Sequence, residues 1–322
     1  MHEADAAPTR KPTPTLADRA LGAYLGLALG DALGATVEFM TPREIALRFA
    51  AQGGVHRHII GGGWLKLAAG EVTDDTTMSL ALGDALLQGE RLGRPLDTTL
   101  IADAYVAWWR GKPVDCGNTC RRGIQRYVRD GTLAGPLQDS DGGNGALMRN
   151  LPAALATLGD DAAFERVSLA QAHVTHHHAL SDAAVLGIGH LLRALLAGAR
   201  RDEAYACIDA FITAHRAFRF QPYPGRASGY IVDTVQTVLH CFTAHDDFEA
   251  AVLAAVNRGD DADTTGALVG MLAGARCGAQ ALPQRWLSRL NRRVLHDLTE
   301  QTHALLALAG LPKRPTTQPA PH

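Results

Sequence analysis

The sequence is poor in cysteine, in aromatic residues and in net charge. Among its 322 residues are five cysteines, and aromatic side chains make up 6%. Five is an odd number, and the spacing of the cysteines matches neither a disulfide-stabilised scaffold nor a structural zinc site. The formal net charge of −2 creates no strong field toward nucleic acid or an anionic membrane. These absences argue against a disulfide-rich secreted domain and against a nucleic-acid-binding protein.

Long apolar runs are also missing. We find no stretch of the ~18 consecutive apolar residues that would span a bilayer. The first twenty residues lack the apolar core of a secretory signal peptide. The sequence therefore predicts a cytoplasmic protein that does not insert into a membrane by itself.

Helical periodicity is what the sequence does have. Hydrophobic residues make up 47% of the chain, and they recur at helical spacing, as in Leu21, Leu25 and Leu29. Alternating β-branched runs, the pattern of half-buried strands, are nearly absent. We expect an all-α fold with a single compact multi-helix domain over residues 16–310. Residues 1–15 and 311–322 are rich in Pro and Thr and are predicted to be disordered. Besides helices near residues 21–33 and 78–86, the expected helices cover about 98–110, 118–129, 145–158, 162–174, 180–198, 202–216, 228–243, 247–256, 264–278 and 286–309.

Two of these helices are unusually rich in glycine and alanine. The segments are ALGAYLGLALGDALGA at residues 20–35 and GALVGMLAGARCGA at residues 266–279. Small residues allow helix axes to approach closely, so the composition indicates tight core packing.

Acidic residues cluster at two predicted helix starts, in residues 73–76 and 260–265. Asp and Thr often cap helices by accepting backbone N–H bonds. Three carboxylates within four residues exceed what capping uses, and crowded carboxylates repel unless a cation or a proton neutralises them. Oxygen donors without Cys or His favour Mg²⁺, Mn²⁺ or Ca²⁺ over Zn²⁺. If the two clusters converge, they offer about six oxygen ligands, which suits two octahedral ions that share a bridging carboxylate.

Three further segments carry polar groups suited to a binding site. The first runs from Asp115 to Thr119. The second is a glycine-rich loop, Asp141 to Arg149, that leads into a predicted helix and so offers backbone N–H groups to an anion. The third contains His173 and residues 176–178, which either approach a metal or cap a helix beside a turn.

In this order, the segments resemble the ADP-ribosylglycohydrolase family over about residues 18–310. A series of separated matches is more specific than any single motif. The matching stretches are DRALGAYLGLALGDALGATVEFM, GGGWL, TDDTTMSLALG, GKPVDCGNTCRRGIQRY, GNGALMRNLPAALATLG, SGYIVDTVQTVLH and NRGDDADTTGALVGMLAGA.

The resemblance implies an all-α fold with a central cleft that holds two divalent cations, Mn²⁺ or Mg²⁺. The implied metal ligands are Thr73, Asp74, Asp75, Asp261, Asp263 and Thr264. It further implies that Asp115 and Glu38 are catalytic, one of them as the acid/base. The implied ADP-ribose contacts are Asn118, Gly142, Gly143, Asn144, Gly145, His176 and Tyr230. The chain departs from the family pattern at Asp260, which adds a carboxylate, and at the triple histidine.

The resemblance also implies a substrate and partners. The most similar members of the family act on nitrogenase iron protein, removing ADP-ribose from an arginine and so reactivating it. Such members dock to a PII signalling protein and an ammonium channel, which would place a cytoplasmic enzyme at the membrane through a partner. Other readings stay open: a hydrolase of another ADP-ribosyl linkage, decided by rim residues such as Arg121, Arg122 and Arg126; a non-catalytic ADP-ribose-binding or immunity protein; or a structural helical protein.

Overall fold

Helices form nearly all the regular structure of the computed structural model, which describes residues 13–310. The predicted all-α fold is confirmed. In this range the only β pairing is two isolated bridges, Gly62 with Leu67 and Gly143 with Tyr230. The helices are α1 (Leu16–Gly34), α2 (Pro42–Arg48), α3 (Asp74–Arg91), α4 (Thr98–Arg110), α5 (Asn118–Asp130), α6 (Leu151–Ala156), α7 (Asp161–His173), α8 (Ala179–Leu196), α9 (Arg201–Ala214), α10 (Ile231–Ala244), α11 (Phe248–Val256), α12 (Ala262–Cys277), α13 (Gln284–Leu287) and α14 (Arg292–Leu308).

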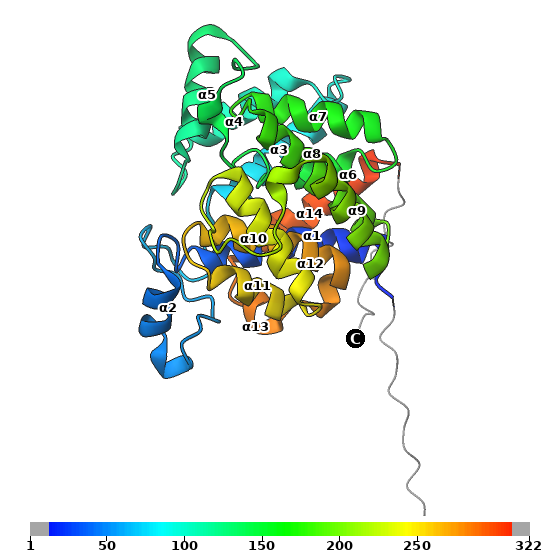
Figure 1. Ribbon diagram of the computed structural model, residues 1–322. Coiled ribbons are helices and arrows are strands. Elements are labelled where there is room, and N and C mark those ends of the chain that lie inside the picture. Colours follow the sequence, from blue (N-terminus) through cyan, green and yellow to red (C-terminus); the bar gives the residue numbers. More distant parts are fainter. Residues whose placement is uncertain (1–12, 311–322) are drawn as a thin grey trace, which may run out of the picture.

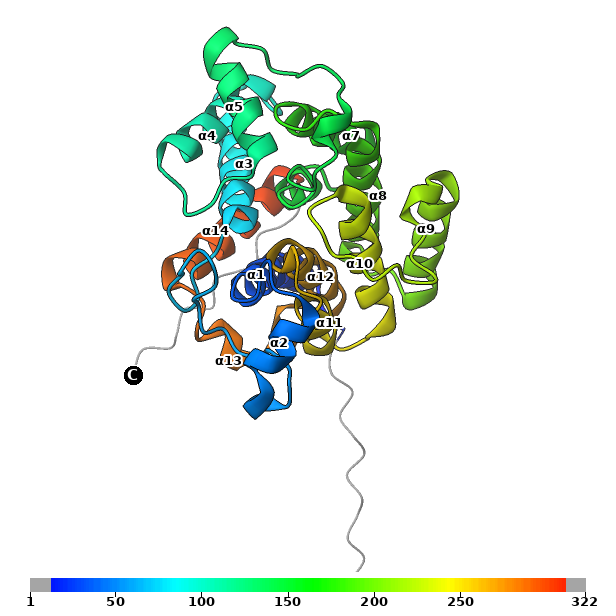
Figure 2. The same cartoon turned by 60° about the vertical axis from the view of Figure 1, so that its left-hand side comes forward.

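The two glycine-rich helices, α1 and α12, lie side by side at the centre, with the other helices around them (Figures 1 and 2). Their backbones touch. A Cβ atom added at Gly26 would lie 2.2 Å from the carbonyl oxygen of Gly270, and one added at Gly30 would lie 2.0 Å from that of Gly266. Only glycine permits this distance at such positions. The tight packing expected from the composition is therefore confirmed.

The register of this contact brings one end of each helix to the same place. The two helices are antiparallel, because Gly22 faces Gly274 near one end while Gly34 faces Ala262 at the other. The residues that follow α1, Glu38 among them, therefore lie beside the first turn of α12. Segments more than 220 positions apart in sequence meet there.

The start of α3 is attached to α1 by a buried carboxylate. Asp31 accepts hydrogen bonds from the backbone N–H of Thr73 at 3.0 Å and of Thr76 at 3.2 Å. It also accepts the hydroxyl of Thr76 at 2.5 Å. Asp31 thus supplies the N-terminal cap of α3 from another helix, and it brings a third helix end to the junction of α1 and α12.

Two predicted helices are wrong in extent. The expected helix at 145–158 begins only at Leu151, because Pro152 has no N–H to donate and suits a first turn. Residues 145–149 form turns instead, with the Asn144 carbonyl accepting from Leu147 and Met148. The expected helix at 286–309 is two helices, since Asn291 caps a new one at Arg292. The short helix α2 was not predicted.

Within residues 13–310, one helix, α8, is long and apolar enough by length and composition to cross a membrane. Of this segment 56% is buried against the rest of the protein, as in the core helix of a soluble domain. Asp182 and Arg193 interrupt this helix, so it is not a continuous apolar run. Of the residues predicted to be disordered, 1–12 and 311–322 lie outside the described range. Residues 13–15 of the predicted N-terminal arm are described, and Thr15 caps α1.

Candidate active site

A cleft of about 490 Å³ opens where α1, α3, α5 and α12 have their ends. Most of the residues predicted from the sequence line it. They are Glu38, Asp74, Asp115, Asn118, Gly143, Asn144, Gly145, His176, Asp261, Asp263 and Thr264. The cleft wall does not include Thr73, Asp75, Gly142 and Tyr230.

The two acidic clusters meet in this cleft, as the metal hypothesis required. Carboxylate oxygens of Glu38, Asp261 and Asp263 lie within 4.8 Å of one another. The hydroxyl of Thr264 donates to Oδ2 of Asp75 at 3.1 Å, which links the start of α12 to the start of α3. Since Asp75 lies directly behind the wall, it belongs to the same constellation.

Helix capping does not account for these acidic residues. Neither Thr73, the N-cap of α3, nor Asp261, the N-cap of α12, accepts a capping bond with its side chain. The carboxylate that caps α3 is instead Asp31, which was not among the predicted site residues. Its only signal was a carboxylate within the otherwise uncharged part of α1, residues 20–34.

The carboxylates of the cleft are buried without cationic partners. Among residues 13–310, no Lys, Arg or His forms an ion pair with Glu38, Asp74, Asp75, Asp261 or Asp263. Burial and the neighbouring carboxylates raise every pKa in the set.

The size of this effect varies within the group. Burial raises the pKa of Glu38 to about 8, that of Asp74 to about 7 and that of Asp31 to about 6. The pKa values of Asp75 and Asp263 are raised well above their ordinary range for the same reason. A site of this kind retains protons until a cation replaces them.

The donor set fits divalent cations. Oδ1 of Asp75 is buried and has no hydrogen-bond partner, so a lone pair is available there. The carboxylates and hydroxyls of the two clusters supply hard oxygens, the ligands that Mg²⁺ and Mn²⁺ prefer. The predicted ligand residues therefore lie together, and one of their buried oxygens has no partner. Their role as ligands stays a prediction.

The loop before α5 borders the predicted metal ligands. The backbone N–H of Gly117 donates to Oδ2 of Asp74 at 3.2 Å, which holds Asp115 and Asn118 near the carboxylates. Burial raises the pKa of Asp115, while its bond from the Cys116 N–H and the charge of Arg121 oppose this rise. A carboxyl group with a raised pKa is suited to acid/base catalysis.

The glycine loop, Asp141 to Arg149, does not lead directly into a helix as expected. No helix starts directly after it, because α6 begins at Leu151, so the predicted helix N-terminus is absent there. The N–H of Asn144 is already bonded to the Gly229 carbonyl. The side chain of Asn144 instead donates to Oδ2 of Asp261 at 2.5 Å and to Thr234 at 2.9 Å, which connects the loop to the acidic cluster.

The four histidines separate into different roles. His176 is buried in the cleft wall against Gly143 and Gly145, and burial holds its pKa well below the ordinary value, so the ring is neutral. His178 caps α8 by accepting from the Leu180 N–H, which confirms the capping interpretation for that residue. His173 pairs with Asp182 at 2.9 Å, and His177 bonds the Gly135 carbonyl.

Tyr230 and the rim arginines lie at the edge. Tyr230 is 46% exposed and its ring covers Gly142, where a Cβ would lie 3.2 Å from it. An exposed aromatic face is available to stack on a base. Of the three arginines, Arg121 lines the cleft, Arg122 pairs with Asp141 at 3.0 Å, and Arg126 bonds the Val174 carbonyl at 2.8 Å.

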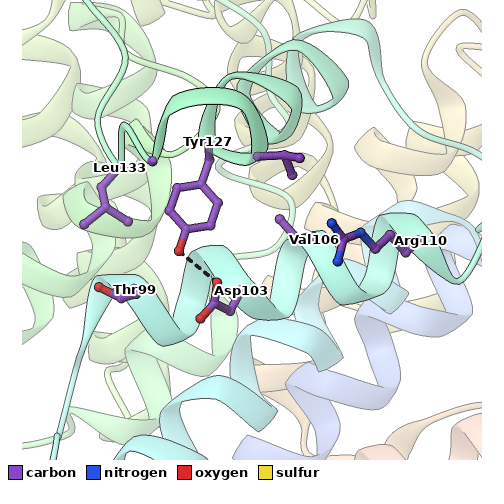
Figure 3. Close-up of a pocket in the computed structure, with 8 residues that line it drawn as sticks. Thr99, Asp103, Val106, Arg110, Tyr127 and Leu133 are labelled. Atoms are coloured by element: carbon purple, nitrogen blue, oxygen red, sulfur yellow. Dashed lines mark hydrogen bonds between the residues drawn. The ribbon is translucent and has the colours of Figure 1, made fainter.

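A second hollow, between α4 and α5, is separate from this site (Figure 3). None of the predicted functional residues lines it. There the Tyr127 hydroxyl donates to Oδ1 of Asp103 at 2.8 Å. This bond attaches α5 to α4, and α5 begins with Asn118 at the cleft.

Comparisons with known proteins agree with the motifs. The family model for ADP-ribosylglycohydrolase matches residues 12–314. The chain is 52% identical to ADP-ribosyl-[dinitrogen reductase] glycohydrolase of Rhodospirillum rubrum, over 92% of this chain and 99% of that protein. It is 31% identical to ADP-ribosylarginine hydrolase Tri1 of Serratia proteamaculans, over 88% of this chain and 78% of that protein.

A solved structure has the same architecture. It is described as an ADP-ribosylglycohydrolase-related protein complex, and it superposes with a TM-score of 0.78 at 34% identity, covering 91% of this chain and 99% of that one. The resemblance inferred from the sequence is therefore confirmed: the chain belongs to the ADP-ribosylglycohydrolase family.

Proposed function

We propose that this protein is a metal-dependent hydrolase that removes ADP-ribose from an arginine side chain of a target protein. The observation that carries the proposal is the convergence of Glu38, Asp261 and Asp263 within 4.8 Å in a cleft that also contains Asp115 and Asn118. Carboxylates in this density, none of them in an ion pair with a cationic side chain of residues 13–310, suit a metal-assisted hydrolysis.

The proposed cofactor is a pair of Mn²⁺ or Mg²⁺ ions. Their ligands would come from Thr73, Asp74 and Asp75 on one side and from Asp261, Asp263 and Thr264 on the other. When bound, such ions orient the hydroxyls of a ribose and lower the pKa of a water molecule.

The protein's own groups would act on the glycosidic bond. Cleavage develops positive charge at the anomeric carbon, which the surrounding carboxylates stabilise. Asp115, with its raised pKa, would protonate the leaving guanidine nitrogen. Glu38, held by the indole N–H of Trp64 at 2.6 Å, would orient the water or a metal ion. The two roles are interchangeable in this proposal.

The remainder of ADP-ribose would extend toward the glycine loop. Gly142, Gly143 and Gly145 would accommodate the diphosphate, with neutral His176 beside it. The exposed ring of Tyr230 would stack on adenine. The products are free ADP-ribose and unmodified arginine.

The proposed target is nitrogenase iron protein. The supporting observation is the 52% identity to the Rhodospirillum rubrum protein, whose name gives dinitrogen reductase as its target. A cytoplasmic location, with docking to a PII protein and an ammonium channel, belongs to the same proposal. It is tested by co-purification from membranes with and without those two partners.

Turnover of ADP-ribosylated nitrogenase iron protein, with and without Mn²⁺, tests the proposal. We expect release of ADP-ribose that needs the ion and is lost in Asp115→Asn and Asp263→Ala. Binding without release would identify an ADP-ribose-binding protein instead. Release only from serine- or DNA-linked ADP-ribose would identify a different linkage, and wild-type turnover in both variants would refute the residue roles.

A further inference from the structure

Two large aromatic side chains stand exposed at the edge of the cleft. Phe39 is 63% exposed and Trp64 is 50% exposed, and both line the cleft. Their ring centroids lie 5.3 Å apart. Because they come from separate loops, the pair is a product of the fold. Exposed paired aromatics at a cleft mouth are typical of a recognition surface.

The backbone beneath this pair is held in an unfavourable conformation. Phe39 has φ of 60° and Asp260 has φ of 55°, a region that costs a residue with a side chain roughly 1–2 kcal/mol. Two hydrogen bonds join these residues: the Phe39 N–H donates to the Asp260 carbonyl at 2.7 Å, and the Asp260 N–H donates to the Met40 carbonyl at 2.8 Å. Strain maintained in this way is characteristic of functional sites.

The aromatic pair and the glycine loop contact different carboxylates of the acidic cluster. Trp64 contacts the cluster through Glu38, to which its indole N–H donates at 2.6 Å. The glycine loop contacts the cluster through Asn144 and Asp261. If the diphosphate occupies the glycine loop and the ribose lies over the acidic cluster, the group on the far carbon of the ribose comes within reach of Phe39 and Trp64, which line the same cleft.

We propose that Phe39, Trp64 and the Asp260 carboxylate form a binding subsite for the guanidinium and adjoining chain of the modified arginine. This inference rests on the proposed function and extends it to the recognition of the protein substrate. A guanidinium packs favourably on the face of an aromatic ring and pairs with a carboxylate.

The charge of Asp260 supports this assignment. Asp260 lines the cleft, and none of the residues at 13–310 forms an ion pair with it. Its backbone is fixed against that of Phe39, so the carboxylate and the ring are presented together. Asp260 is the departure from the family pattern found in the sequence, and the subsite gives this extra carboxylate a use.

Steady-state kinetics on arginine-ADP-ribosylated protein test the subsite. The variants are Phe39→Leu, which keeps apolar bulk and loses the ring; Asp260→Asn, which loses the charge; and Leu47→Ala as the control. Leu47 is 68% exposed on the neighbouring helix α2 and does not line the cleft. Inhibition by free ADP-ribose is measured in parallel, because this product lacks the guanidinium and also reports whether each variant is folded.

We expect KM to rise roughly tenfold in Phe39→Leu and in Asp260→Asn, with kcat and the affinity for ADP-ribose within about twofold of wild type. The control should match wild type throughout. An unchanged KM in both variants would overturn the subsite, and so would a loss of ADP-ribose affinity as large as the rise in KM. In either case, turnover of the arginine-linked substrate by the wild-type protein would leave the proposed function standing. A wild-type protein that ignores the arginine linkage and cleaves another would overturn both.

Discussion

The contact between α1 and α12 and the acidic cleft at its end differ in the residues that form them. Along the contact, glycine backbones meet without any side chain between them, as at Gly26 and Gly270. At the end of the contact, carboxylates crowd together and one buried oxygen of Asp75 has no partner. The first region is satisfied and closely packed, whereas the second is unsatisfied and electrostatically unfavourable until a cation enters.

This difference shows how the site is maintained. Burying unpaired carboxylates destabilises a fold, so a rigid element must hold them in place. The backbone contact does so because it permits only one register, and that register sets Gly34 beside Ala262. Stability and chemistry are therefore divided between adjacent parts of the same two helices, and substitutions in each part should have distinct consequences.

The largest effect should follow from breaking the helix contact. Gly30→Ala would put a Cβ 2.0 Å from the Gly266 carbonyl oxygen. Since backbone cannot move aside as a side chain does, we expect a loss of about 3 kcal/mol in the free energy of unfolding, and loss of activity with it. Thermal and denaturant unfolding measure this.

The matched control is Gly187→Ala on α8. Its new Cβ would meet only the Phe211 ring, which borders a hollow of about 610 Å³ and has room to shift. Gly187→Ala should therefore cost much less. Equal stability of both variants would contradict the account of the α1–α12 contact.

A change in the acidic cleft should separate activity from stability. Asp263→Ala removes a proposed ligand, and we expect turnover to fall by roughly 10³-fold or more. The metal-free variant should unfold no more easily than wild type, because a buried unpaired carboxylate has been removed. Asp202→Asn on α9, with an exposed side chain, is the control for both measurements. A large loss of stability in Asp263→Ala would mean that the carboxylates hold the fold together.

Metal ions should stabilise only an intact cleft. At a concentration 100 times the dissociation constant, a ligand that binds only the folded state adds about 2.7 kcal/mol. Mn²⁺ should thus raise the Tm of wild type, and chelation should reverse the rise. An equal rise in Asp263→Ala would place the ion elsewhere.

The smallest effect concerns pH in the metal-free protein. Burial raises the pKa of Asp74 to about 7 and of Glu38 to about 8, above the unfolded values near 4. The folded state therefore holds protons that the unfolded state has released, and stability falls as pH rises from about 4 to 8. Unfolding at several pH values should show this slope, and saturating Mn²⁺ should flatten it. A metal-free protein that gains stability over this range would contradict the burial of these carboxyl groups.

Much of the fold follows from local patterns in the sequence. The helix at Thr98–Arg110 coincides with its predicted range, and α5 begins at Asn118 as expected. Failures occurred where a single residue overrides periodicity, as Pro152 and Asn291 do. The spacing of apolar residues does not reveal a helix boundary that is set by a capping side chain or by a proline without an N–H, because the apolar pattern continues across it.

The candidate site was predictable as a set of residues but not as an arrangement. Adjacent acids at helix starts identified Asp74, Asp75, Asp261 and Asp263. Asp31 and Trp64 were not identified as site residues, since each acts through partners remote in sequence: Asp31 caps α3, and Trp64 bonds Glu38. Spacing along the chain carries no information on such contacts, which depend on how the helices pack.

Titration of the metal-free protein with Mn²⁺, followed by electron paramagnetic resonance, tests the central claim most directly. The account predicts that the first two equivalents bind to wild type with loss of the signal of the free aqueous ion, and that Asp263→Ala binds fewer. A wild-type protein that leaves the free-ion signal undiminished, or a variant that binds as wild type does, would contradict the claim that these carboxylates form a metal centre.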